Sequence, residues 1–297
     1  MTGSVTMKYL SNLVILLLLL SCEKPIEDTV LIGSPDETDA DANVSLRFTT
    51  DEPVFTRTDM SAYISRLNIQ LFDGQGTKVF DRVKTQTSSD SEFASLSLQL
   101  EPGTYTVVAV GHSSPVSATI KSPQLVQFTA QSGRKLSDTF CFYGSIVCNA
   151  SPVTLDCNMR RVSAMFHIII TDEDIPSDYA QMRFDYTGGS ANFNPTTQEG
   201  CTKSNQSELF PAVHPYDYQI YTFPYMAATG KITVTATALN ATGATILQRR
   251  FVDVPVTRGV VTTYTGQYFG DAGGVLSQTG FYFTVDTDWK DTLYIHY

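Results

Sequence analysis

The feature that most constrains the fold is an alternation of apolar and polar residues, which recurs along most of the chain. A period of two residues is typical of a strand with one face on a core and the other in solvent. Glycine and proline turn signals separate the alternating segments, and no convincing amphipathic helix exceeds two turns. The sequence therefore predicts an all-β fold built from sandwiches. The clearest alternating segments are residues 44–48, 67–71, 96–100, 162–170 and 232–238.

These segments fall into two sets, which predicts two domains. One set lies in residues 43–150 and the other in residues 151–297, with Ala150-Ser151-Pro152 between them. Hydrophobic residues make up 42% of the chain, so each half can bury a core of its own. We therefore expect an N-terminal sandwich over residues 43–150 and a C-terminal sandwich over residues 151–297.

The N-terminal segment reads as an export signal. Lys8 precedes an unbroken apolar run, Leu13 to Leu20, which is shorter than the roughly 20 residues needed to span a bilayer. The run ends in Leu19-Leu20-Ser21-Cys22, which resembles the bacterial lipobox, where the chain is cut before a cysteine that receives lipid. The alternative is an ordinary signal peptide with a chance cysteine. We predict that residues 1–21 are a lipoprotein signal peptide and that Cys22 is the lipidated N-terminus.

A lipidated Cys22 would attach the chain to a membrane. Each buried methylene contributes about 0.8 kcal/mol, so several acyl chains, palmitate among them, hold a protein stably where one holds it marginally. Residues 22–42 show no hydrophobic periodicity and carry six acidic residues between Glu27 and Asp41, which predicts a flexible tether.

The sequence contains no motif for catalysis, a cofactor or a metal. It lacks HExxH, a phosphate loop, a nucleophile elbow and a dinucleotide fingerprint, and residues 172–174 lack the EF-hand spacing, which leaves a solvated loop. A net charge of −10 without a basic cluster argues against nucleic acid as a partner. We therefore predict a protein that is not an enzyme and has no cofactor. The four histidines are isolated: His112, His167, a mid-strand residue read as structural, His214 and His296.

Four cysteines remain after Cys22, and four allow three pairings. Export permits disulfides, but no CxxC occurs and no histidine lies at zinc-ligand spacing. We favour free, buried thiols and leave the pairing open. The four are Cys141, Cys148, Cys157 and Cys201.

Five phrases, taken in order with the lipobox, resemble the fimbrial anchor-subunit lipoproteins of Bacteroidales, the fimbrillin-associated anchor proteins. The resemblance covers nearly the whole mature chain. It implies two tandem transthyretin-like β-sandwich domains, lipid-anchored placement at the outer membrane and cell surface, and a role at the base of a fimbria with fimbrial subunits as partners. The phrases are residues 69–73, 98–111, 159–166, 254–259 and 285–289.

Two other functions stay open: a surface glycan-binding lipoprotein and a fimbrial tip adhesin. The lipid anchor favours the base of a fimbria over its tip. Unlike fimbrial shaft subunits, the chain has no evident processing site for removing an N-terminal strand. Arg57 and Arg66 could nevertheless be cut, so removal of that strand is left open.

The C-terminal segment is the candidate for subunit contact. Residues 281–289 would extend about 30 Å at roughly 3.3 Å per residue, and three glycines between 270 and 274 precede them as a hinge. Such a strand could be donated to another subunit, or it could pack at home and protect a sheet edge. The residues proposed for the contact are Phe281, Phe283, Val285 and Trp289.

Overall fold

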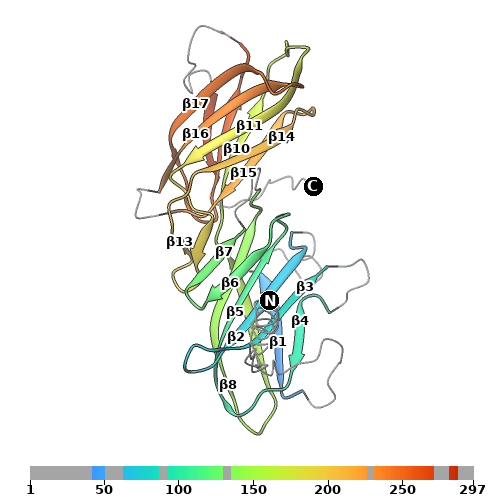
Figure 1. Ribbon diagram of the computed structural model, residues 1–297, viewed down its shortest axis with the longest axis vertical. Helices are drawn as coiled ribbons and strands as arrows, with labels where there is room; N and C mark the ends of the chain where they lie inside the picture. The colour runs from blue at the N-terminus through green and yellow to red at the C-terminus, as the bar shows by residue number, and fades with distance from the viewer. Residues whose placement is uncertain are drawn as a thin grey trace, which may run out of the picture. The chain divides into compact units, whose positions relative to one another are not determined.

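The computed structural model describes residues 42–50, 63–86, 92–129, 135–225, 230–270 and 281–286, all of them in one compact unit. These residues form strands joined by turns and bends, and none of them is helical. Accordingly, no helix long and apolar enough to cross a membrane occurs among them. The predicted all-β class is confirmed (Figure 1).

The first half forms a seven-stranded sheet in the order β3-β2-β5-β8-β9-β1-β4. The junction between β8 and β9 is short, with two residue pairs, Phe140–Arg161 and Cys141–Arg160. Strands on both sides of this junction contribute to one core, which includes Phe48, Ile69, Val107 and Met159. The strands are β1 (Val44–Thr50), β2 (Arg66–Phe72), β3 (Lys78–Thr85), β4 (Ser95–Leu98), β5 (Gly103–His112), β8 (Thr139–Cys148) and β9 (Val153–Arg161).

Strand β1 lies inside this sheet rather than at its edge. It pairs in parallel with β9 along its whole length, Val44 with Val153 through Thr50 with Met159, and antiparallel with β4. Its alternating apolar side chains are fully buried in the first core. Burying a side chain such as Leu or Phe contributes about 1.5–3 kcal/mol, so β1 is an integral part of that core.

The second half contains two four-stranded sheets, in the orders β15-β10-β18-β19 and β14-β11-β16-β17. Both contribute to a second core in which Phe166 contacts Phe251 edge-on at a centroid distance of 5.6 Å. The strands are β10 (Ala164–Ile170), β11 (Tyr179–Thr187), β14 (Gln206–Pro211), β15 (Asp217–Thr222), β16 (Lys231–Asn240), β17 (Thr245–Pro255), β18 (Val261–Gly266) and β19 (Phe281–Asp286).

A fourth sheet, in the order β13-β12-β7-β6, joins the two halves. Strand β7 (Leu125–Phe128) belongs to the first half and pairs with β12 (Asn192–Asn194) of the second, through Val126 and Phe193. The outer strands are β6 (Ala118–Ser122) and β13 (Glu199–Gly200). A third core cluster likewise combines side chains of both halves, among them Val108, Val110, Phe193 and Phe223.

The sheets do not change at the boundary expected after Ala150. Strand β9 pairs with β1 and β8 and places Cys157 and Met159 in the first core, so it belongs to the first half. The turn signal at 149–152 joins β8 to β9, and in this turn the backbone N–H of Ser151 donates to Asn149 Oδ1. The change to the second set of sheets comes after Arg161, between β9 and β10. Each half has a core of its own, but the third cluster and the mixed sheet make the halves interdependent.

Candidate functional site

The predicted contact strand forms β19 at the edge of its own sheet. It pairs antiparallel with β18, placing Phe283 opposite Tyr264 and Val285 opposite Thr262. The half-buried Phe281 ring contacts Phe251 of the second core at a centroid distance of 5.2 Å. The other two residues predicted from the sequence, Cys22 and Trp289, lie outside the described residues.

Two further residues singled out in the sequence have defined partners. The structural reading of His167 is confirmed, since its Nε2 lies 2.6 Å from Asp217 Oδ1 and its Nδ1 lies 3.3 Å from Thr263 Oγ1. The expectation of a solvated loop is wrong for Asp172. Its carboxylate accepts hydrogen bonds from the backbone N–H groups of residues 268–270, and thereby holds the segment that follows β18.

The remaining cysteines carry free thiols in the structure. Cys141, Cys148 and Cys157 are buried, and Cys201 is exposed. Burial raises the pKa of Cys157 to about 12, so this thiol stays protonated and unreactive near neutral pH. No group of three histidine, cysteine or acidic side chains in the described part of the chain is placed to hold a metal ion.

A concave site with a volume of about 520 Å³ has walls that come from both halves. This volume is in the range of small-molecule sites. The first half contributes the segment that leads into β2, the loop after β5 and the segment that leads into β8; the second half contributes β14 and β15. The lining side chains used below are Tyr63, Arg66, Ser113, Lys135, Ser137, Asp138, Glu208, Phe210, Gln219 and Tyr221.

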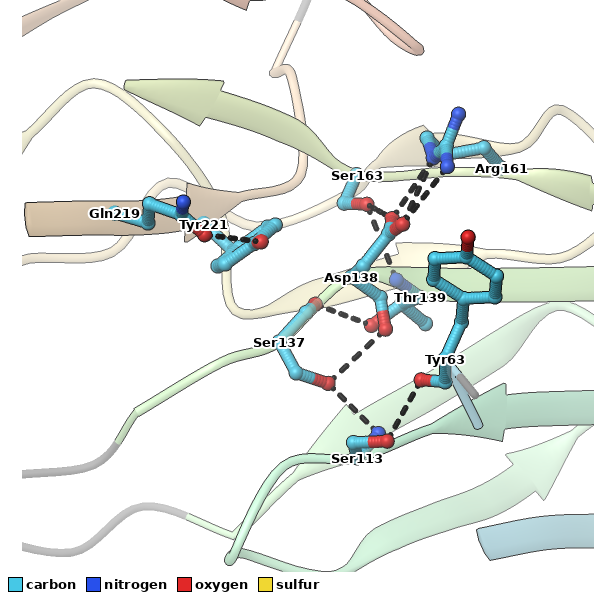
Figure 2. A network of polar contacts seen from close by, with 9 residues as sticks. All are labelled: Tyr63, Ser113, Ser137, Asp138, Thr139, Arg161, Ser163, Gln219 and Tyr221. Carbon is cyan, nitrogen blue, oxygen red and sulfur yellow. Dashed lines mark hydrogen bonds and ion pairs between the residues drawn. The ribbon is translucent and has the colours of Figure 1, made fainter. Parts of the chain in front are cut away.

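Asp138 of this lining belongs to a buried ion pair with Arg161 (Figure 2). Arg161 Nε donates to both carboxylate oxygens of Asp138, at 2.9 and 3.0 Å, and Arg161 Nη2 lies 2.9 Å from Asp138 Oδ2. Ser163 Oγ donates to Asp138 Oδ1 at 2.7 Å and accepts from the backbone N–H of Thr139. The two charged side chains are only 6% and 3% exposed. Because Arg161 ends β9 and Ser163 precedes β10, the ion pair fixes the passage from one half to the other.

Serine hydroxyls tie the first-half wall together (Figure 2). Ser113 Oγ donates to the carbonyl oxygen of Tyr63 at 2.7 Å and accepts from the backbone N–H of Ser65 at 3.0 Å. The backbone N–H of Ser113 donates to Ser137 Oγ at 2.9 Å, and Ser137 Oγ donates to the carbonyl oxygen of Asp138. Three segments far apart in the sequence are thus held in fixed positions around the cavity.

The second-half wall combines acidic, amide and aromatic groups. Glu208, which is 1% exposed, accepts a hydrogen bond from the hydroxyl of Tyr186 at 2.7 Å. Tyr221 donates to Gln219 Oε1 at 3.1 Å. Lys135 reaches across from the first half, with its Nζ 4.0 Å from the centroid of the Phe210 ring. Burial lowers the pKa of Lys135, and the carboxylate of Glu208 acts in the opposite direction.

Comparison with known proteins assigns the family. The family model described as fimbrillin-A associated anchor proteins Mfa1 and Mfa2 matches residues 35–289. The chain belongs to this family. No curated protein sequence matches the chain significantly. Membership in this anchor family places the protein among fimbria-associated proteins of the cell surface.

Similar solved structures agree with the fold. A Bacteroides thetaiotaomicron protein provisionally named an adhesin is 13% identical, with a TM-score of 0.52, over 82% of this chain and 96% of that one. A second protein of that organism, provisionally named polysaccharide-binding, is 10% identical with a TM-score of 0.50, over 76% and 92%. The fimbrial anchor protein Mfa2 of Porphyromonas gingivalis is 13% identical with a TM-score of 0.45, over 82% and 96%. At these identities the first two likenesses show the fold alone.

The sequence does not predict the cavity. Its lining residues come from five short segments that no spacing motif connects, and only the folded chain brings them together. Arg66 was notable in the sequence solely as a possible cleavage site. Asp138 and Arg161 are charged residues at the ends of alternating segments. Because a charged side chain that is buried is usually paired, this position is a weak indication of an ion pair.

Proposed function

We propose that this protein anchors a fimbria at the outer membrane through a lipidated Cys22 and contacts the neighbouring subunit by strand pairing. The observation that carries the proposal is the family match over residues 35–289, which begins shortly after a lipobox that ends at Cys22. An anchor needs a membrane attachment at one end and a surface for a subunit at the other. A lipidated Cys22 in a chain of this family would supply the membrane attachment.

The position of β1 supports an anchor that keeps its N-terminal strand. The chain between Cys22 and the sandwich enters the fold through β1, and β1 lies between β9 and β4. Cleavage at Arg57 or Arg66 would break the covalent link between the lipid and the body. It would leave β1 held by hydrogen bonds and core packing alone. We therefore propose that the mature anchor is uncut between Cys22 and β2.

Strand β19 is the proposed contact element. It is the last strand in the order β15-β10-β18-β19, so one of its edges pairs with β18, while no strand of the described residues pairs with the other. We propose that this second edge takes the added strand. Main-chain hydrogen bonds to a sheet edge provide affinity for an extended partner segment, and the alternate side chains provide specificity. In this arrangement β19 acts from its place in the sheet, as a template for a strand of the next subunit.

Replacement of the lipid-accepting cysteine tests the anchor. Cys22→Ala is expected to release the protein from membranes or to leave an uncleaved precursor, with fimbriae shed into the medium. Cys201→Ala is the matched control, because it removes an exposed thiol and leaves the lipobox intact. Mature-sized Cys22→Ala protein that stays on membranes in the absence of fimbrial subunits would contradict the proposal.

Truncation after Gly274 tests the contact strand. Loss of subunit capture by a protein that stays folded would support β19 as a contact element. Aggregation or unfolding of the second half would instead assign β19 to its own core, in line with the Phe281–Phe251 contact. Unchanged folding together with unchanged fimbriae would remove β19 from both roles.

A further inference from the structure

One edge of strand β8 has no partner strand over most of its length. Strand β8 pairs with β5 from Thr139 to Cys148, but its pairing with β9 stops after Phe140 and Cys141. In the described part of the chain, no other strand and no isolated bridge pairs with residues 142–148. At roughly 3.3 Å per residue this free edge is about 23 Å long, which is enough to pair with a whole strand.

The free edge lacks the features that normally keep a sheet edge from pairing. Natural edge strands carry charged residues, prolines or bulges, or they are very short. Residues 142–148 contain no charged residue and no proline, and the register of β8 with β5 runs without a shift. By contrast, the edge strand β3 carries four charged residues. One of them, Lys84, donates to the carbonyl oxygens of Glu92 and Ser95 beside the opposite edge strand, β4. The sequence thus protects the edge at β3 and leaves the edge at β8 unprotected.

Two exposed apolar side chains flank the centre of the free edge. Tyr143 and Val147 are 37% and 61% exposed, and the exposed Ser145 lies midway between them on the same face of the strand. A single exposed apolar side chain is ordinary on a protein surface. A pair of them on an edge without charges is what a strand covered by a partner would show when the partner is absent.

The positions of these residues select a second copy of the same chain as the partner. The free edge runs from 142 to 148, so two copies that run antiparallel about its midpoint, Ser145, overlap over the whole edge. Tyr143 of each copy then lies opposite Val147 of the other. An aromatic side chain opposite a β-branched one is a favourable cross-strand pair. Contact between the same surface on both copies is the arrangement of a two-fold symmetric dimer.

We propose that two copies of this protein pair through residues 142–148 of β8 into a two-fold dimer. With the proposed lipidation, the dimer carries two lipid anchors, and two linked anchors hold an assembly on a membrane more firmly than one. Val44 pairs with Val153 just after the turn that follows β8, so the two tethers enter at opposite ends of the shared ladder. The predicted tether, residues 22–42, can extend to about 70 Å, so both copies can reach one membrane.

Disulfide trapping in cell membranes tests the proposal, in a Cys201→Ala background that removes the exposed native thiol. Antiparallel pairing about Ser145 brings its Cα atoms in the two copies to about 4.5–5.5 Å, which is within disulfide range. Ser145→Cys is therefore expected to give a cross-linked dimer on mild oxidation. The background without an added cysteine is expected to stay monomeric on the same gel.

Thr104→Cys is the matched control. Thr104 is exposed and lies opposite Val147 on the neighbouring strand β5, so three strand spacings, about 14 Å or more, would separate it from its copy in the dimer. Because Cα atoms more than about 7 Å apart cannot be bridged, we expect at least about tenfold less cross-linked dimer than for Ser145→Cys. Equal yields at the two positions, or cross-linking of Ser145→Cys only to a protein of another mass, would overturn the proposal.

A charge swap tests the register without a disulfide. Tyr143→Lys or Val147→Glu alone places a charge on the edge and is expected to reduce the dimer. Dimer is measured by light scattering after size-exclusion chromatography of the detergent-solubilised chain. The double variant places each lysine opposite a glutamate of the other copy and is expected to restore the dimer. A monomeric wild type, or a double variant that folds by its melting temperature but stays monomeric, would refute the pairing. The pairing uses neither Cys22 nor β19, so its failure would leave the proposed anchor function standing.

Discussion

Replacing His112 with leucine is expected to stabilise the protein, and increasingly so as the pH falls. The His112 side chain is fully buried at the end of β5, with its ring edge-on to Phe128 at a centroid distance of 5.1 Å. Neither ring nitrogen has a hydrogen-bond partner in the described part of the chain. Burial, together with the charge of Arg66, lowers the pKa of His112 from 6.5 to about 4. An imidazole in these surroundings is neutral in the folded protein and costs stability by its desolvation.

The size of the effect follows from the pKa. Between pH 6.5 and pH 4 the unfolded chain binds a proton at this histidine and the folded chain does not, so the stability of the wild type falls as the pH falls. A lowering from 6.5 to about 4 corresponds to about 3 kcal/mol in full, of which about 2 kcal/mol is lost by pH 5. Leucine binds no proton, so His112→Leu escapes this loss. Removal of two unpaired nitrogens adds a gain of about 1 kcal/mol at every pH.

Urea unfolding of both proteins at pH 7, 6 and 5, followed by far-UV circular dichroism, measures the difference directly. Other titrating groups affect both proteins equally and cancel in that difference. His214→Leu is the control, because His214 is exposed in the folded protein. If His112→Leu and the wild type lose stability in parallel between pH 7 and pH 5, the buried imidazole is not the cause of acid sensitivity and the reasoning fails.

Three further outcomes are expected. Asp138→Ala should lower the free energy of unfolding by about 3–5 kcal/mol in a denaturant titration, because it leaves the Arg161 guanidinium buried without its ion partner; a loss below about 1 kcal/mol would mean that water replaces the carboxylate. Gly188→Ala should lower the melting temperature, since Gly188 has a φ of +103° and an added Cβ would lie 2.5 Å from a backbone oxygen of β16; an unchanged melting temperature would show that the turn relaxes. A thiol reagent at pH 8 should label the exposed Cys201 in the native protein and Cys157 only after unfolding, as read by mass spectrometry, and rapid native labelling of Cys157 would contradict its burial.

The sequence could predict those strands whose apolar–polar pattern lies within one short segment of the chain. The alternation at 44–48 and 232–238 appears as β1 and β16, because the pattern of one segment determines which of its faces is buried. The sheets change after Arg161 and not after Ala150, because a turn between two strands of one core and a linker have the same local composition, and only the pairing of β9 with β1 distinguishes them. The cavity was missed for the same reason, since Arg66 and Phe210 are brought together by long-range packing that leaves no local pattern.

The interior position of β1 also determines how the molecule carries tension. A pull on the chain before Val44 acts along the axis of β1, while a load on the second half reaches the first through the C-terminal end of β9 at Arg161. Because β1 and β9 run parallel, these two forces point in opposite directions along neighbouring strands, and the hydrogen bonds between Val44–Thr50 and Val153–Met159 are loaded together in shear. An antiparallel hairpin pulled apart from one end would instead open one bond at a time. A fold that is pulled through an interior parallel strand such as β1 resists extraction with the whole ladder at once.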